Sequence, residues 1–351
     1  MISEIKQIQP ETILVSCPNW VGDVVMATPA FECIRQNYPE ARLIGMIRKY
    51  ARGVVEDAPW FGQLIEIDDK TFSGIFKLVQ RLRRMNPELA FVLPNSFRSA
   101  LIARLGKAKK VYGYRRNGRT FLLSGGPPPL RNGKRITPVP MVEYYLEICR
   151  WMHLAGTQQK KPRLYISDAV QQEGNQLLKS YGINPDSMVI GLNPGAKFGS
   201  SKCWPPEYFA RLAELLAKRW NCSLLLFVGP GEKTIGEKIV ELSKAKIINT
   251  GPDNVDLALL KPLIRRCRLL VTNDTGPRHY AVAFNVPVAV IMGPTDPRYT
   301  HTNLEKTIVL RRDSECSPCH LKECTMNHNC MTEISPEAVL QACEQLLQEH
   351  S

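Results

Sequence analysis

The sequence has no hydrophobic run long enough to cross a membrane. Its longest apolar stretches, residues 224–228 and 282–292, fall well short of the ~18 residues that a membrane span needs. Residues 1–17 contain acidic side chains where a signal peptide carries basic ones, and no apolar segment follows them. We therefore expect a protein that is neither exported nor inserted in a membrane, although it can still touch a membrane surface.

Acidic residues are missing from one long stretch. No carboxylate side chain lies between Glu88 and Glu143, whereas eleven Lys and Arg lie there. Residues 1–165 hold 26 basic and 13 acidic side chains, while residues 166–351 hold 20 of each, so the first half carries the whole net charge of +13. Such a surface attracts nucleic acid, an anionic membrane or a phosphorylated substrate. A solvated basic face without a specific ligand is the alternative.

A disulfide framework is not expected, although the chain has eleven cysteines. The chain is long, and seven of these residues are scattered singly, which indicates reduced thiols. The other four follow the spacing Cys-x2-Cys-x4-Cys-x5-Cys and are Cys316, Cys319, Cys324 and Cys330. Four close thiolates can form a tetrahedral zinc site, but the second pair lacks the usual C-x2-C spacing. Reduced thiols or adventitious disulfides are the other interpretations.

Short apolar runs alternate with amphipathic stretches along the chain, which is typical of parallel strands joined by crossover helices. A length of 351 residues favours two domains. We predict an α/β fold with two Rossmann-like domains, residues 1–165 and 185–330, that face each other across a cleft. The polar segment 157–187 separates them.

The periodicity also predicts individual elements. In the first domain we expect strands at 12–17, 43–47, 64–67 and 89–93, helices at 24–37, 72–85 and 142–155, and a proline-rich loop at 125–140. In the second we expect strands at 188–192, 223–228, 246–249, 269–272 and 288–292, helices at 206–220, 234–243, 256–265 and 278–284, and a final helix at 336–349.

The loop after the first strand carries Gly22 and Asp23 at the start of a helix. An aspartate there is commonly an N-cap worth ~1 kcal/mol. It can also act as a general base in the cleft, because ligands bind beyond the carboxyl ends of parallel strands. The residues alone leave both interpretations open.

A second polar turn follows the strand at 269–272. Thr275 and Gly276 place a hydroxyl and backbone N–H groups at a positive helix end, which favours phosphate binding, and Asp274 and His279 lie on the same rim. An ordinary capped turn is the alternative. Asp-Thr-Gly also occurs in aspartic proteases, but their fold is all-β and this chain is not.

Two further loops lie at the same predicted edge. Gly195, Ala196 and Lys202 come before a helix and suit a diphosphate, and Glu232 can accept hydrogen bonds from ribose hydroxyls. The sequence has neither a Walker loop nor a G-x-G-x-x-G fingerprint. A diphosphate held without either motif indicates a sugar nucleotide.

Four motifs in this order resemble the bacterial lipopolysaccharide heptosyltransferases, most closely the ADP-heptose heptosyltransferase II branch. They are residues 19–23 with 28–29, residues 94–99, residues 194–196 with 202–205, and residues 273–276 with His279. The resemblance implies a GT-B fold, with an acceptor-binding domain first, a nucleotide-sugar domain second, and a last helix, 336–349, that packs back on the first domain.

The resemblance implies an inverting transfer of L-glycero-D-manno-heptose from ADP-heptose to the first heptose of the lipopolysaccharide inner core. By this resemblance the acceptor would be Kdo-lipid A carrying one heptose, and the enzyme would be cytoplasmic and peripheral to the inner face of the membrane, without nucleic acid as a partner. Asp23 would be the catalytic base. No metal is expected for the transfer, because a lysine and a helix N-terminus can stabilise the departing ADP.

The resemblance also assigns the binding residues. The donor would contact Gly195, Ala196, Lys202, Glu232, Val255, Asp274, Thr275, Gly276 and His279. The anionic acceptor would contact Asn95, Arg98, Arg115, Arg116 and Arg119.

Two rival functions are also compatible with the sequence. A nucleic-acid-binding α/β protein would interleave stacking aromatics with its basic residues, and the acid-free stretch offers only Phe91, Phe97, Tyr112, Tyr114 and Phe121. The other rival is a different GT-B enzyme, either a heptosyltransferase I or III type or a sugar-nucleotide epimerase. An epimerase has no polyanionic acceptor, so the basic half argues against it.

Overall fold

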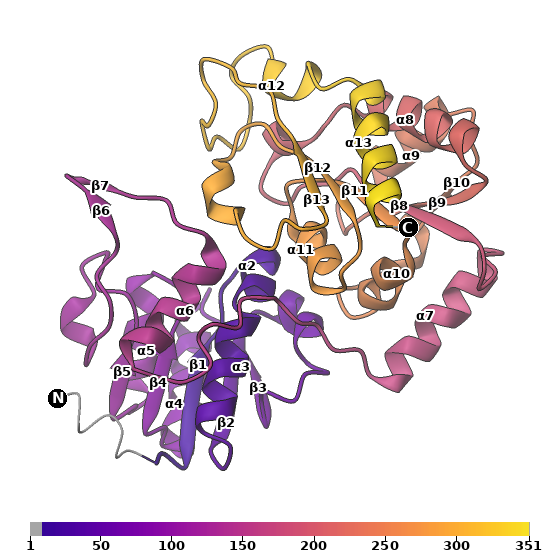
Figure 1. The fold of residues 1–351 in the computed structure, drawn as a ribbon. Helices are drawn as coiled ribbons and strands as arrows, with labels where there is room; N and C mark the ends of the chain where they lie inside the picture. Colours follow the sequence, from indigo (N-terminus) through magenta and orange to yellow (C-terminus); the bar gives the residue numbers. More distant parts are fainter. Residues whose placement is uncertain (1–8, 351) are drawn as a thin grey trace. The chain divides into compact units, whose positions relative to one another are not determined.

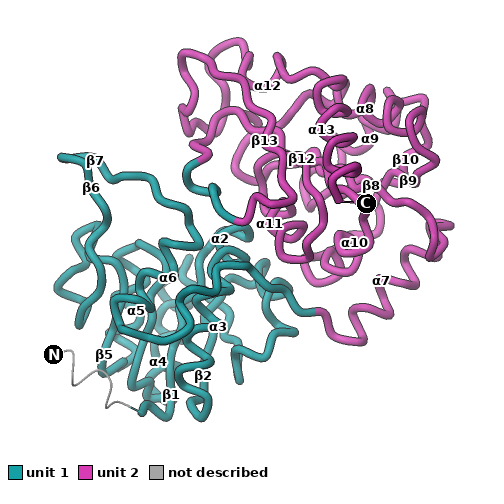
Figure 2. The backbone as a smooth tube through the Cα atoms, in the orientation of Figure 1, with its two compact units in different colours: residues 1–165, 298–302 teal, residues 166–297, 303–351 magenta. Residues whose placement is uncertain are grey.

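The computed structural model describes residues 9–350 and forms two compact units (Figure 2). Unit 1 comprises the chain up to residue 165 together with 298–302. Unit 2 comprises residues 166–297 and 303–351. The predicted first domain also ends at residue 165. No helix within residues 9–350 is both long enough and apolar enough to span a membrane.

Unit 1 is built on a five-stranded parallel sheet in the order β3-β2-β1-β4-β5 (Figure 1). The strands are β1 (Thr12–Ser16), β2 (Arg42–Ile47), β3 (Gln63–Glu66), β4 (Leu89–Val92) and β5 (Lys110–Tyr112). The helices are α2 (Val21–Met26), α3 (Thr28–Asn37), α4 (Phe72–Met85), α5 (Phe97–Leu105) and α6 (Met141–Trp151). Helices α4 and α5 pack together over one apolar core, and α6 packs on α2 and α3.

Three features of unit 1 differ from the expected elements. The helix expected at 24–37 is broken at Ala27, because Pro29 lies in the first turn of a second helix. The loop expected at 125–140 contains a short antiparallel hairpin, β6 (Arg131–Asn132) and β7 (Arg135–Ile136). Helix α5 and strand β5 were not expected, and a 3-10 turn, η2 (Thr120–Leu122), follows them.

Unit 2 is built on a six-stranded parallel sheet in the order β10-β9-β8-β11-β12-β13. Its strands are β8 (Met188–Asn193), β9 (Cys222–Leu226), β10 (Ile247–Asn249), β11 (Leu269–Asn273), β12 (Val288–Ile291) and β13 (Thr307–Leu310). Its main helices are α7 (Asp168–Ser180), α8 (Pro206–Arg219), α9 (Lys233–Leu242), α10 (Leu260–Arg266), α11 (Gly276–Ala283) and α13 (Pro336–Glu349). The predicted α/β class is confirmed. Helix α7 lies in the segment expected to be a linker.

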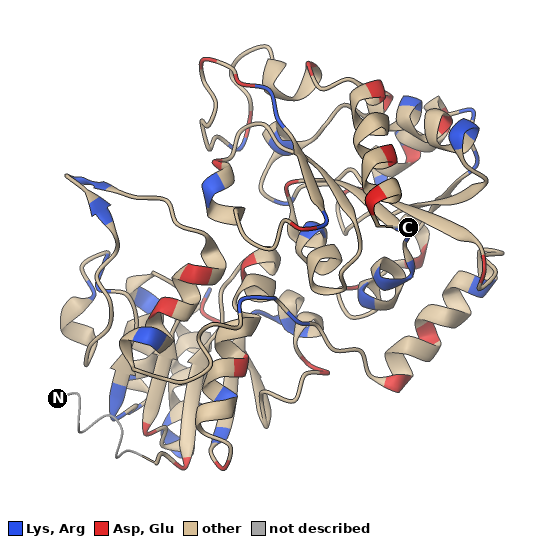
Figure 3. Ribbon diagram, in the orientation of Figure 1, with Lys and Arg blue, Asp and Glu red and all other residues tan. Residues whose placement is uncertain are grey.

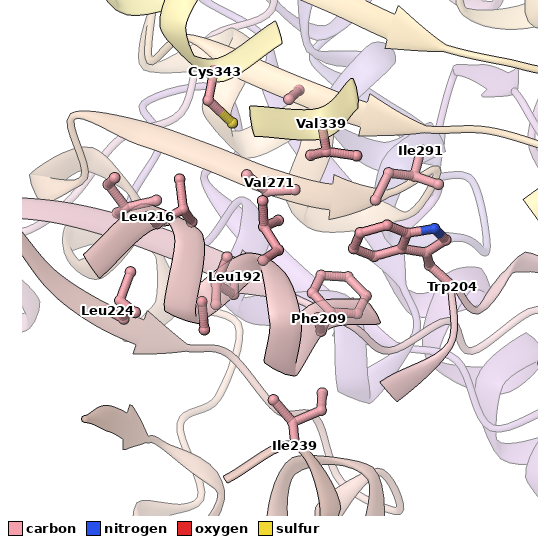
Figure 4. Packing of buried hydrophobic residues seen from close by; sticks show 14 of the residues in the cluster. Leu192, Trp204, Phe209, Leu216, Leu224, Ile239, Val271, Ile291, Val339 and Cys343 are labelled. Carbon is pink, nitrogen blue, oxygen red and sulfur yellow. The ribbon is translucent and has the colours of Figure 1, made fainter. Parts of the chain in front are cut away.

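The last helix packs on unit 2 rather than on unit 1. Val339 and Cys343 of α13 are buried in the same core as Leu216 of α8 and Ile291 of β12 (Figure 4). Outside this core, Arg219 Nε donates to Glu344 Oε1 at 2.5 Å. The expectation that residues 336–349 pack back on the first domain is therefore corrected. The apolar stripe of α13 covers the face of the unit 2 sheet that would otherwise expose Val271 and Ile291.

Candidate functional sites

Asp23 lies beyond the carboxyl end of β1, in the first turn of α2. Tyr145 of α6 donates a hydrogen bond from Oη to Asp23 Oδ1 at 2.9 Å. Burial raises the pKa of Tyr145 well above its usual value, and the adjacent Asp23 charge raises it further. Tyr145 therefore stays a neutral donor that fixes one oxygen of the carboxylate.

A tyrosine network extends from this carboxylate to two expected acceptor residues. Tyr144 stacks on Tyr114 with ring centroids 3.7 Å apart and meets Tyr145 edge to face. The Tyr144 hydroxyl donates to Asn95 Oδ1 at 2.8 Å and accepts from Arg116 Nη1 at 3.4 Å. Asn95 and Arg116 are thus connected to Asp23 through two adjacent residues of α6, neither of which the sequence identified.

Arg98 belongs to a second network, built around a buried carboxylate. Its Nη1 donates to the backbone oxygen of Asp69 at 3.0 Å, and Arg48 forms a two-pronged ion pair with the Asp69 carboxylate. Burial works to raise the pKa of Asp69, but the two arginines outweigh it and hold the pKa below its usual value. Arg48 Nε also donates to Asn19 Oδ1 at 3.1 Å, which connects Arg98 to the loop that precedes Asp23.

The structure gives Arg119 a different role from the expected one. Its side chain is fully buried, and its guanidinium donates to the backbone oxygens of Tyr114, Pro94 and Ser96. Burial lowers the pKa of Arg119 to about 10. The expected acceptor contact is therefore corrected: Arg119 holds the loop that carries Asn95, whereas the neighbouring Arg115 is exposed.

In unit 2, Asp274 is the centre of a buried ion network directly after β11. Its carboxylate accepts from Lys202 Nζ at 2.9 Å and from Arg278 Nη1 at 2.9 Å, and the Thr295 hydroxyl donates to it at 2.7 Å. Burial opposes ionisation, but Lys202 and Arg278 outweigh it and lower the pKa of Asp274 far below its usual value. The two cations flank one permanent anion.

The turn around Thr275 is held by amide side chains from neighbouring strands. Asn193 at the end of β8 donates to the Thr275 hydroxyl at 3.1 Å, and Asn273 donates to the Pro194 backbone oxygen at 2.6 Å. Gly276 is the first residue of α11, and His279 lies one turn further. Burial, and then the charge of Arg278, lowers the pKa of His279 to about 3. His279 is therefore a neutral ring near pH 7.

Glu232 is folded against the loop that carries Gly195. Its Oε2 accepts from the Gly229 N–H at 3.0 Å, and a Cβ at Gly195 would lie 2.0 Å from the same oxygen. Only glycine allows this close approach. Val255 is buried and follows β10.

These donor-site residues share one edge of the unit 2 sheet. Ala196 and Lys202 follow β8, Glu232 follows β9, Val255 follows β10 and Asp274 follows β11. The four strands are adjacent and parallel, so their carboxyl ends meet at one edge. The structure brings the expected donor residues to that edge, and it adds Arg278 and Thr295.

The cysteine segment 316–330 lies against the loops of this edge. The Ser201 N–H donates to the Lys322 backbone oxygen at 3.0 Å, and a His328 ring nitrogen lies 2.7 Å from the Ser201 backbone oxygen. The Ser317 hydroxyl donates to the Gly293 backbone oxygen at 2.6 Å. The segment therefore supports the loop of Lys202 and the chain leading to Thr295.

The four clustered cysteines lie near one another, since burial raises the pKa of Cys330 and Cys316, Cys324 and Cys319 raise it further. All eleven cysteines are free thiols, so no disulfide is formed. Within residues 9–350, no group of three or more His, Cys, Asp or Glu side chains has an arrangement that could hold a metal ion. The zinc interpretation of Cys316, Cys319, Cys324 and Cys330 stays a prediction.

Comparison with known proteins supplies the family. Residues 75–329 match the family described as glycosyltransferase family 9 (heptosyltransferase). Lipooligosaccharide heptosyltransferase 2 of Haemophilus ducreyi is 30% identical, with 95% of this chain and 99% of the relative covered. The structure of E. coli ADP-heptose LPS heptosyltransferase II matches with a TM-score of 0.79 and 27% identity, over 97% of this chain and 100% of that chain. A glycosyltransferase family 9 structure from Veillonella parvula shares the fold, with a TM-score of 0.84 and 24% identity over 97% and 98% of the two chains.

Two parallel α/β units, each with polar loops at the carboxyl edge of its sheet, define a glycosyltransferase of the GT-B type. The chain belongs to glycosyltransferase family 9, the heptosyltransferases.

Proposed function

We propose that this protein is a heptosyltransferase II, which transfers L-glycero-D-manno-heptose from ADP-heptose to the first heptose of the lipopolysaccharide inner core. The assignment of ADP-heptose as the donor rests on the ion network of Lys202, Asp274 and Arg278 at the start of α11. Two cations around one carboxylate, the buried Arg278 and the half-buried Lys202, lie next to helix N–H groups and suit a diphosphate. The relative from Haemophilus ducreyi and the E. coli structure carry heptosyltransferase 2 in their names, which supports the acceptor assignment.

In the proposed reaction Asp23 takes the proton of the acceptor hydroxyl as its oxygen attacks the anomeric carbon. The bond from that carbon to the diphosphate breaks on the opposite face, so the configuration inverts. ADP leaves with the bonding electron pair, and Lys202 and the α11 N-terminus stabilise its charge. The proposal requires no metal ion, because these groups already supply the positive charge.

The acceptor half of the proposal rests on unit 1. Asn95 and Arg116 share the tyrosine network with Asp23, and Arg98 and Arg115 present further positive charge. These residues would contact the carboxylates and phosphates of Kdo-lipid A. The anchored acceptor places the enzyme on the cytoplasmic face of the inner membrane, with no nucleic acid as a partner.

The test offers purified protein ADP-heptose with Kdo-lipid A acceptors that bear zero, one or two heptoses. We expect transfer to the one-heptose acceptor, detected as a mass increase of one heptose. Turnover confined to the zero-heptose acceptor would reject the proposal in favour of a heptosyltransferase I type. Turnover confined to the two-heptose acceptor would favour a type III enzyme.

A further inference from the structure

Unit 1 exposes large aromatic side chains that its own fold does not use. Phe72 is 89% exposed, Phe76 59%, Phe121 75% and Phe97 42%. We call these four residues the phenylalanine edge. Exposed apolar groups of this size that gather at one place mark an interaction site more often than chance. In unit 2, no Phe, Tyr or Trp among the described residues is exposed.

The four rings gather because of how α4 and α5 are placed. Both helices begin beyond the carboxyl ends of parallel strands and pack together on the same face of the sheet. Phe72 and Phe97 are the first residues of these helices. Phe76 lies one turn after Phe72 on the same side of α4. The ring centroids of Phe97 and Phe121 are 5.8 Å apart.

A hydrogen bond joins the two helix starts. Arg98, next to Phe97, donates to the backbone oxygen of Asp69, three residues before Phe72, at 3.0 Å. The phenylalanine edge is therefore one region of unit 1 and not four scattered side chains.

Positive charge surrounds this region. Exposed basic residues beside it in the sequence are Lys70, Lys77, Arg98 and Arg115. Elsewhere in unit 1, the hairpin of β6 and β7 also carries exposed basic residues (Figure 3). Among the nearby carboxylates, Asp69 is buried in its ion pairs, and Glu88 lies at the opposite end of β4, where it pairs with Lys109. Asp68, next to Gly74, is exposed and is one negative charge among the four basic residues. The exposed charge at this edge is thus predominantly positive.

Exposed Phe side chains interleaved with Lys and Arg on a helical surface suit the interface of an anionic bilayer, where rings enter the headgroup boundary and cations meet lipid phosphates. Single-stranded nucleic acid is less well matched, because Phe97 and Phe121 already pack on each other at 53° and leave fewer open ring faces for bases. We propose that the phenylalanine edge and its surrounding cations dock unit 1 on an anionic lipid bilayer. The inference rests on the proposed function, since a lipid-anchored acceptor requires the enzyme to work at such a surface.

The experiment measures sedimentation of the full chain with phosphatidylcholine vesicles, with and without about one-third phosphatidylglycerol. Neither vesicle contains the acceptor sugar. We expect binding only to the anionic vesicles, weakened about tenfold by Phe72→Gln with Phe76→Gln, since two inserted rings are lost. A similar loss is expected for Lys70→Gln with Lys77→Gln, because each cation contributes to the attraction. Two matched control variants change residues of unit 2 and should bind the anionic vesicles as the wild type does. They are Val240→Gln with Leu242→Gln, and Lys179→Gln with Lys218→Gln.

The outcomes separate docking from catalysis. Turnover of a lipid-free, one-heptose oligosaccharide should be unchanged by Phe72→Gln with Phe76→Gln, while turnover of vesicle-borne acceptor falls. Wild-type vesicle binding by that variant overturns the docking inference and leaves the proposed function standing. Vesicle binding by a wild-type protein that transfers no heptose rejects the proposed function alone. Binding of single-stranded RNA that depends on the same phenylalanines, without vesicle binding, would instead overturn docking in favour of nucleic acid.

Discussion

The two units have similar sheets, yet their polar residues are held in opposite ways. In unit 2, Asp274, Arg278 and His279 are buried, and the Asp274 carboxylate is paired with Arg278. In unit 1, Arg98 and Arg115 are exposed, and all six exposed aromatic side chains of the described residues lie there. A small, highly charged donor suits a preformed pocket, because fixed charges cost no reorganisation at the moment of reaction. A large anchored acceptor suits an open surface.

The strongest test of this difference between the units removes the Asp23 carboxylate of unit 1. Asp23→Ala should lower kcat by about a thousandfold, because general-base catalysis is lost. The affinity for ADP-heptose should stay close to that of the wild type, since the donor residues lie in unit 2. Steady-state kinetics and calorimetric titration of the donor measure the two effects.

Glu40→Gln, an exposed carboxylate of the same unit, serves as the control and should retain activity. Near-wild-type turnover by Asp23→Ala would contradict the assigned role.

The corresponding test in unit 2 targets Lys202. Lys202→Gln should weaken donor binding by about a hundredfold, because a charge-assisted contact to the diphosphate is lost. Asp274 keeps Arg278 as a partner, so the fold should survive. Donor titration and a thermal melt report both, and Lys197→Gln, on an exposed lysine of the same loop, is the matched control. Equal losses of donor affinity in the two variants would contradict a specific contact between Lys202 and the diphosphate.

A third test separates a structural arginine from a binding one within unit 1. Arg119→Gln should destabilise the protein by about 3 kcal/mol, because several buried carbonyl groups lose a charged donor. Arg115→Gln should leave the melting temperature unchanged and raise only KM for the acceptor. Urea unfolding and acceptor kinetics on both variants measure the difference. A stable Arg119→Gln protein with a raised acceptor KM would restore the role expected from the sequence.

Strong periodicity and clear caps explain which elements the sequence predicted. Helices α4 and α13 have the predicted bounds, 72–85 and 336–349, and each begins after a hydroxyl residue, Thr71 or Ser335, that caps it. Helix α5 was missed because residues 97–105 show almost no amphipathic pattern, and the three-residue strand β5 is too short to produce one.

Site residues could be predicted only where they directly follow a strand in the sequence, because that fixes their place at the edge of the sheet. Asp23, Lys202 and Asp274 each follow a strand, and the carboxyl ends of parallel strands mark binding loops. The same rule could have found Thr295, which follows β12. Nothing in the sequence distinguishes Tyr145, which contacts Asp23, from an ordinary core tyrosine of α6. Equally, charge counting cannot separate a buried arginine such as Arg119 from an exposed one.

A smaller effect tests how Asp23 is held. Tyr145→Phe removes one hydrogen bond to the carboxylate and should lower kcat about tenfold, in line with the value of a bond to a charged group. KM for the donor should not change. The acidic limb of the kcat profile should move to higher pH, because the charged form of Asp23 loses a donor.

Tyr144→Phe, which keeps the Tyr145 bond, is the control. A profile that does not move would make Tyr145 a packing residue only.

The last prediction concerns the pH dependence of stability in unit 2. The pKa of His279 falls to about 3 in the fold, against 6.5 for an ordinary histidine. Above pH 6.5 the ring is neutral in both states, so His279 adds no pH dependence. Between pH 6.5 and 3 only the unfolded chain takes up the proton, so stability falls as pH falls, by at most about 1.4 kcal/mol per pH unit. Urea unfolding at pH 7 and pH 5 should therefore show a loss that His279→Gln lacks and that His301→Gln, on an exposed histidine, retains. An equal loss in all three proteins would mean that groups other than His279 cause the loss of stability in acid.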